Sequence, residues 1–247
     1  MSDRPILDRA LTPEMMDVAL RVARAGTPYA DSLRLLEVAL RELVPSAEAM
    51  LKTRKALTRI WIRPPARAQA MIGWATRTDL DSDSRILHLG ALLATTKFFG
   101  DVCAQVGRQM SLNGETSTTS LRRQIYQSWG QRTSVDVGVR KCVRTLRHFR
   151  VLEGRIGGTL STRGEQIDVP TSFADWLAHG LLLARSVSSI EEREIRRAPE
   201  LFMFNLPARI EGTYRLVDHV NEGGGRKLVV IAEVPAVRMA GQLALPV

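Results

Sequence analysis

The stretch SWGQRTSVDVGVRKCVRTLRHFRVLEGRIGG, which runs from Ser128 to Gly158, decides the fold because it predicts an amphipathic helix followed by a hairpin. In the helix expected from Thr133 to Phe149, six apolar residues recur with the period of an α-helix. They are Val135, Val139, Cys142, Val143, Leu146 and Phe149. The opposite side has a stripe of Thr133, Val137, Arg140, Arg144 and Arg147, with Lys141 and His148 beside it. We therefore expect the helix to bury one side and to present arginines from the other.

The segments on either side of this helix extend the pattern. Upstream, TSLRRQIYQSWG (119–130) predicts a helix whose Leu121, Ile125 and Trp129 face inward. Residues 130–132 form a short turn, after which Thr133 or Ser134 is expected as the N-cap. Downstream, VLEGRIGGTLSTR (151–163) predicts two strands around the pair Gly157-Gly158.

From Thr118 to Arg163, this order of helix, turn, basic helix and hairpin resembles a winged helix-turn-helix DNA-binding domain. The longer layout is similar to the small DNA-binding subunit of BREX phage-defence systems, through SW..RT leading into LRHFRVLEG and through LFMFNLP. Residues 227–247 have no counterpart in that layout. The resemblance implies that the second helix enters the major groove of double-stranded DNA, that the hairpin is a wing, and that other subunits of a defence complex are partners.

Individual residues are expected to make two kinds of DNA contact. Arg140 and Arg144 are expected at base edges, since arginine can donate two hydrogen bonds to guanine, with Ser134 and Val137 nearer the groove floor. Other basic residues are expected at phosphates, where contacts position the protein without reading sequence. The complete expected DNA-binding set is Arg122, Arg123, Arg132, Thr133, Ser134, Val137, Arg140, Lys141, Arg144, Arg147, Arg155 and Arg163.

The distribution of charge agrees with a polyanionic partner. The formal net charge is +9, and residues 117–163 have ten Lys and Arg against two acids. Residues 51–78 have seven basic residues and no acid. Lys and Arg contacts to phosphates supply most of the affinity of DNA-binding proteins and its salt dependence. The alternatives are a solvated basic face and a winged helix that serves only as a protein–protein scaffold.

The second basic block lies on a helix expected from Ala47 to about Trp61. On this helix Lys52, Lys55 and Arg59 share a stripe. The residues expected to pack are Met50, Leu51, Leu57, Ile60 and Trp61. Three interpretations are open: a second contact with DNA, a face for an acidic protein partner, and a solvated helix whose long basic side chains cover apolar surface.

The whole chain is expected to be mainly α, with a multi-helical N-terminal part, the central winged helix-turn-helix and C-terminal helices with a small β element. The expected domain bounds are 1–112, 113–170 and 171–247. Within the first part, residues 86–110 predict one helix, or two broken near Gly100, and residues 111–120 predict a loop. The C-terminal part predicts two helices and a late strand from Lys227 to Val234.

The sequence offers little for catalysis, a metal or a cofactor. The four histidines stand far apart, and no nucleophile elbow, Walker motif or dinucleotide fingerprint occurs. We therefore expect a DNA-binding protein that has no catalytic activity and no cofactor. It would act as a subunit of a defence system or, alternatively, as a stand-alone transcriptional regulator.

The same sequence bears on location. No run of about 18 uncharged apolar residues exists, and the N-terminus has acids and a proline where a signal peptide needs an apolar stretch. Cys103 and Cys142 lie in helix-like apolar patterns and are expected to be reduced core residues. We expect a cytosolic protein without membrane contact.

Overall fold

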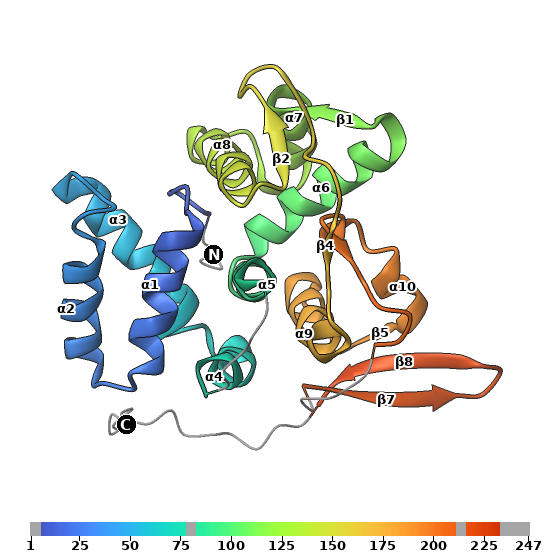
Figure 1. The fold of residues 1–247 in the computed structure, drawn as a ribbon. Coiled ribbons are helices and arrows are strands. Elements are labelled where there is room, and N and C mark those ends of the chain that lie inside the picture. The colour runs from blue at the N-terminus through green and yellow to red at the C-terminus, as the bar shows by residue number, and fades with distance from the viewer. Residues whose placement is uncertain (1–5, 78–82, 211–215, 233–247) are drawn as a thin grey trace.

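The computed structural model describes residues 6–77, 83–210 and 216–232, which form a mainly α fold with three small sheets (Figure 1). The expected fold class of helices with a small β element is confirmed. Helices make up the body of the molecule, and one C-terminal hairpin projects from it (Figure 1).

Two of the N-terminal helices begin at a residue whose side chain caps them. Thr12 accepts a hydrogen bond from the Met15 amide at the start of α1 (Pro13–Arg24), and Ser46 accepts one from the Ala49 amide at the start of α3 (Ala47–Leu57). The other elements of this part are α2 (Tyr29–Leu40), the π-turn η1 (Thr58–Ile62), the 3-10 turn η2 (Ala66–Ala68) and α4 (Gln69–Arg77). Helix α3 continues directly into η1, so the expected helix ends just before the two prolines.

The long apolar stretch forms two helices, α5 (Ser84–Thr95) and α6 (Lys97–Asn113), and the chain bends by 114° between them. The break falls at Thr96, so the expectation of a break near Gly100 is wrong by four residues. Gly100 lies inside α6, where a Cβ atom would lie 3.1 Å from Cβ of Ala184 on α9 (Ala174–Arg185). This glycine therefore permits close helix packing and does not end a helix.

The central part consists of two helices and a small sheet. Its elements are β1 (Glu115–Ser117), α7 (Thr118–Trp129), α8 (Thr133–His148), β2 (Leu152–Gly154) and β3 (Thr159–Thr162). The sheet has the order β1-β3-β2, and both of its pairs are antiparallel. Strand β1 corrects the expectation of a loop over residues 111–120, because its three polar residues are held by pairing with β3.

The C-terminal part has the two expected helices and more β structure than the sequence predicts. Its elements are β4 (Ile167–Asp168), the 3-10 turn η3 (Thr171–Phe173), α9, β5 (Ser189–Glu191), α10 (Glu192–Arg196), the 3-10 turn η4 (Pro199–Leu201), β6 (Phe204–Asn205), β7 (Val217–Glu222) and β8 (Arg226–Ile231). The expected late strand is β8, which pairs with β5 and β7. Its expected end at Val234 lies outside the described residues.

Buried residues from all three parts form one continuous hydrophobic core. Helices α5 and α9 meet at its centre, where a Cβ atom on Gly90 would lie 2.2 Å from Nε1 of Trp176. Cys103 and Cys142 are free and buried in this core, as expected. In the part of the chain that the structure describes, no single helix is long and apolar enough to cross a bilayer; α5 and α6 reach that length and composition only as a bent pair.

Candidate nucleic-acid interface

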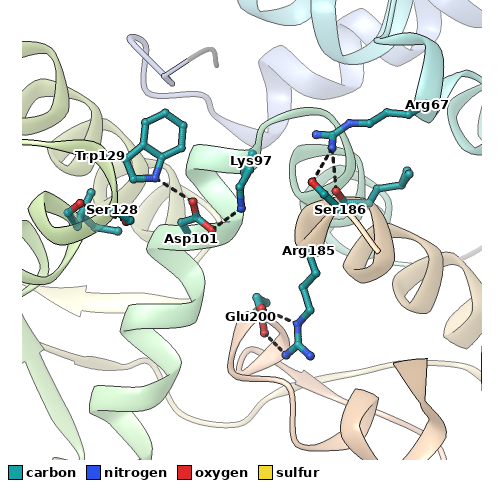
Figure 2. Close-up of polar contacts among 10 residues, drawn as sticks. Arg67, Lys97, Asp101, Ser128, Trp129, Arg185, Ser186 and Glu200 are labelled. Carbon is teal, nitrogen blue, oxygen red and sulfur yellow. Dashed lines mark hydrogen bonds and ion pairs between the residues drawn. The ribbon is translucent and has the colours of Figure 1, made fainter. Parts of the chain in front are cut away.

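Helix α7 is fixed to α6 by Trp129, the last residue of α7. Its indole Nε1 donates to Oδ2 of Asp101 at 2.8 Å (Figure 2). Its ring also meets the Phe98 ring edge to face, with centroids 4.9 Å apart. The second oxygen of Asp101 accepts from Nζ of Lys97 at 3.1 Å. Leu121 and Ile125 are buried on the same side of α7, as expected. These contacts set the position from which the turn leads into α8.

The first turn of α8 differs from the expectation by one residue. Arg132 is the N-cap and has no side-chain cap, so the expectation of Thr133 or Ser134 as N-cap is wrong. The carbonyl of Arg132 already accepts from the Val135 and Asp136 amides, which makes both hydroxyl residues part of the helix. Both are exposed, so they can contact a ligand at this end of α8.

Asp136 connects α8 to α7 through two side chains. Its carboxylate accepts a hydrogen bond from the Tyr126 hydroxyl, and this bond raises the pKa of Tyr126. Nη1 of Arg122 lies 4.0 Å from the other oxygen of Asp136. Arg122 is thus held within the domain by an ion pair, whereas Arg123 on the same helix is exposed. Arg132 donates to the carbonyl of Trp129 at 2.8 Å, which orients its guanidinium along the turn.

The two predicted faces of α8 are confirmed. All six residues of the apolar face are fully buried. On the other side, Arg140, Arg144 and Arg147 are exposed, and Val137 and Lys141 are half-buried. The arginine side chains therefore form a continuous stripe over about two turns of the helix.

One flank of α8 is covered by the N-terminal segment that precedes α1. The Leu11 amide donates to Oγ1 of the buried Thr145 at 3.0 Å. A Cβ atom on Gly138 would lie 2.3 Å from Cγ2 of Ile6 and 2.7 Å from Cε1 of Phe98. Sequence reasoning missed Gly138 and Thr145; the only signal was a small and a polar residue beside the apolar face. These contacts leave the arginine stripe open and place the segment next to it.

Positive side chains from three elements gather around Lys141. Its pKa lies below the ordinary value, first because of burial and then because of the positive charges of Arg144, Arg9, Arg140 and Lys52. Arg9 belongs to the N-terminal segment and Lys52 to α3. Lys52 of the second basic block therefore lies near Lys141 of the first, although the two are far apart in sequence. Figure 1 shows the N-terminal segment between α3 and α8.

Arg155 and Arg163, the two arginines of the expected wing, lie at opposite ends of the β2–β3 hairpin. The turn spans Arg155 to Gly158, whose amide donates to the Arg155 carbonyl at 2.9 Å, so its centre is Ile156-Gly157, one residue earlier than expected. Gly157 has a φ of +91°, which favours glycine. Arg155 is exposed at this tip. Arg163 follows β3 at the base, beside Arg85 and Arg150 in a hollow of about 200 Å³.

The predicted stripe of Lys52, Lys55 and Arg59 divides between two regions. Lys52 lies near α8 and forms an ion pair of 2.5 Å with Glu48, while Lys55 is exposed. Arg59 is half-buried near Arg67, whose pKa is lowered by burial and by the charge of Arg59.

Arg67 and Leu51 lie in the same basic block as this stripe. Arg67 donates to the carbonyl of Leu183 at 3.1 Å and to Oγ of Ser186 at 3.2 Å, at the end of α9 (Figure 2). The expectation that Leu51 packs is wrong, because this side chain faces away from the core and is 59% exposed. Only the Lys52 end of the stripe therefore adjoins α8.

Groups suited to metal binding are not clustered: in residues 6–77, 83–210 and 216–232, no three His, Cys, Asp or Glu side chains are close enough to share an ion. A scan against protein-family models finds no match to this chain, and searches of curated proteins and of solved structures return none. The functional argument therefore rests on the geometry of α7, α8 and the hairpin.

Proposed function

We propose that residues 118–163 are a winged helix that binds double-stranded DNA, and that the protein does so without catalysis. The observation that carries the proposal is the exposed stripe of Arg140, Arg144 and Arg147, which lies opposite a fully buried face of the same helix. A helix that only packs against protein would be expected to mix acidic and basic residues on its outer side. Asp136 is the single acid of α8, and it is engaged by Tyr126 and Arg122.

The arrangement of elements supports the same proposal. Strand β1 precedes the two helices and pairs with residues 159–161 of β3, so the hairpin is attached to this part of the chain through its second strand. Arg155 is exposed at the tip of the hairpin, and we assign this tip the role of a wing that contacts a groove or the DNA backbone. Arg163 stands at the base of the hairpin and is assigned a secondary place in the contact.

The proposed DNA contact of each basic side chain follows from how exposed that side chain is. Arg140 and Arg144 contact base edges in the major groove, with Ser134 and Val137 at the N-terminal end of the helix. Arg123, Arg132 and Arg147 contact phosphates. Arg122, because of its ion pair with Asp136, acts mainly in fixing α7 against α8.

The biological setting proposed for this activity is a cytosolic defence complex. On the resemblance to the small subunit of BREX systems, the protein would dock a larger assembly on DNA. A stand-alone regulator would normally dimerise to match a palindromic site. Gene neighbourhood distinguishes the two, since a defence subunit is expected beside a methyltransferase and a large ATPase.

The test is binding of the purified protein to a labelled duplex across a salt series. The variant Arg140→Ala with Arg144→Ala is compared with a control, Arg197→Ala with Lys227→Ala, which removes the same charge from exposed positions in the C-terminal part. We expect a steep salt dependence for the wild type, because each phosphate contact releases counterions. We expect the α8 variant alone to lose at least about tenfold in affinity, since bidentate base contacts are strong. Absence of wild-type binding at low salt would overturn the proposal.

A further inference from the structure

The basic surface beside α8 extends onto the N-terminal helical part. Lys52 of α3 and Arg9 of the N-terminal segment lie close enough to Lys141 for their charges to lower its pKa. The pKa of Lys52 is raised, first by its hydrogen bond and ion pair with Glu48 and to a smaller extent by Asp8, while Arg9 has a small opposing effect. The three side chains come from separate elements and therefore form a shared surface and not a local sequence feature.

This gathering of like charge is maintained by specific packing. The Leu11 amide donates a hydrogen bond to the Thr145 hydroxyl, and Ile6 packs against Gly138. The segment that contains Arg9 is therefore fixed along α8. Within the described residues, no ion pair joins Arg140, Lys141 or Arg144 to an acid. Close positive charges repel one another unless a polyanion neutralises them. The surface is thus suited to an extended chain of phosphates.

We propose that a DNA duplex bound by α8 continues over the N-terminal segment onto α3, where Arg9 and Lys52 contact its backbone. This inference rests on the proposed function, and it gives the DNA a direction: the duplex leaves α8 on the side of Lys141 and not on the side of α7. The N-terminal helical part then contributes affinity, while α8 contributes base contacts. DNA is favoured as the occupant because the proposed function places it on the adjoining arginine stripe.

The experiment measures duplex affinity and its salt dependence for two variants with opposite expected effects. Lys52→Gln removes a phosphate contact, so the salt slope is expected to fall by about 0.9 and the dissociation constant to rise about threefold. Glu48→Gln removes the acid paired with Lys52 and should strengthen binding about twofold, since it removes a negative charge beside the backbone. The matched controls are Lys227→Gln and Asp218→Asn on the exposed β7–β8 hairpin, which change the net charge equally.

The outcomes separate this inference from the proposed function. It is supported if Lys52→Gln weakens and Glu48→Gln strengthens binding while both hairpin controls match the wild type. It is overturned, and the winged helix retained, if the α8 variant loses affinity but each α3 variant behaves like its control. If the wild type does not bind DNA, both proposals fail. Circular dichroism confirms that each variant is folded.

Discussion

Helices α8 and α9 have opposite relations to solvent. Every residue of α9 from Ala174 to Ala184 is buried, whereas α8 buries one face and exposes its arginine stripe. A helix that is apolar all round belongs inside a domain, and a helix with one apolar face belongs at its surface. The difference teaches that the helix at the centre of the fold is not the helix that presents the candidate site. Stability and DNA binding should therefore respond to different residues.

The largest effect is expected from Trp176→Ala in α9. The Trp176 ring is fully buried, lies 5.4 Å from Trp74 between ring centroids, and donates through Nε1 to the Ile86 carbonyl at 3.3 Å. Its removal should lower the free energy of unfolding by about 3–5 kcal/mol, through lost burial and the cavity that remains. Urea denaturation measures the change, with the half-buried Trp74→Ala as a milder comparison. A loss below about 1 kcal/mol would place the centre of the core elsewhere.

The next effect is a dependence of stability on pH that originates in α9. Burial lowers the pKa of His179 from 6.5 to about 4, with a smaller opposing effect from the backbone of Leu216. Between these values the unfolded chain binds the proton and the folded chain does not. The contribution of neutral His179 to the free energy of unfolding is therefore complete above pH 6.5. It is lost as the pH falls toward 4, by about 1.4 kcal/mol per pH unit.

This dependence is measured by urea denaturation at several pH values between 4 and 7. His179→Leu should flatten the fall in stability, since leucine has no proton to bind. The same substitution at His219, which is exposed on β7, provides the control. Equal pH profiles for the two variants would show that His179 does not contribute.

An intermediate effect is expected where α8 meets the N-terminal segment. Gly138→Ala places a methyl group against Ile6 and Phe98 and should cost about 1–3 kcal/mol, because the well-packed neighbours must move. Gly73 is a matched control: it lies in α4, and a Cβ atom there would meet nothing within 4 Å, so Gly73→Ala should stabilise by about 0.5–1 kcal/mol. Thermal melting distinguishes the two. The same sign for both variants would contradict the close contact of Ile6 with α8.

Gly138 also shows which parts of the structure the sequence could predict. The two faces of α8 follow from its own periodicity, so the apolar set and the arginine stripe could be predicted residue by residue. Strand β1 could not, because Glu115, Thr116 and Ser117 have no strand-like pattern and become a strand only by pairing with β3. The contact of Thr145 with Leu11 spans 134 residues and leaves no local signal. The proximity of Lys52 to α8 could likewise not be predicted from the sequence, because it depends on how α1 and α3 pack in the folded protein.

The smallest effect on stability is expected from the arginines to which the proposed function assigns the base contacts. Arg140 and Arg144 are exposed and have no ion-pair partner in the described part of the chain, so their replacement by alanine should change the free energy of unfolding by less than about 0.5 kcal/mol. Urea denaturation of the double variant, beside the DNA titration, tests both halves of the comparison. A stability loss above about 1 kcal/mol would mean that these side chains pack within the protein. Unchanged stability with lost binding would show that these arginines of α8 serve ligand binding, whereas the stability of the fold depends on buried helices such as α9.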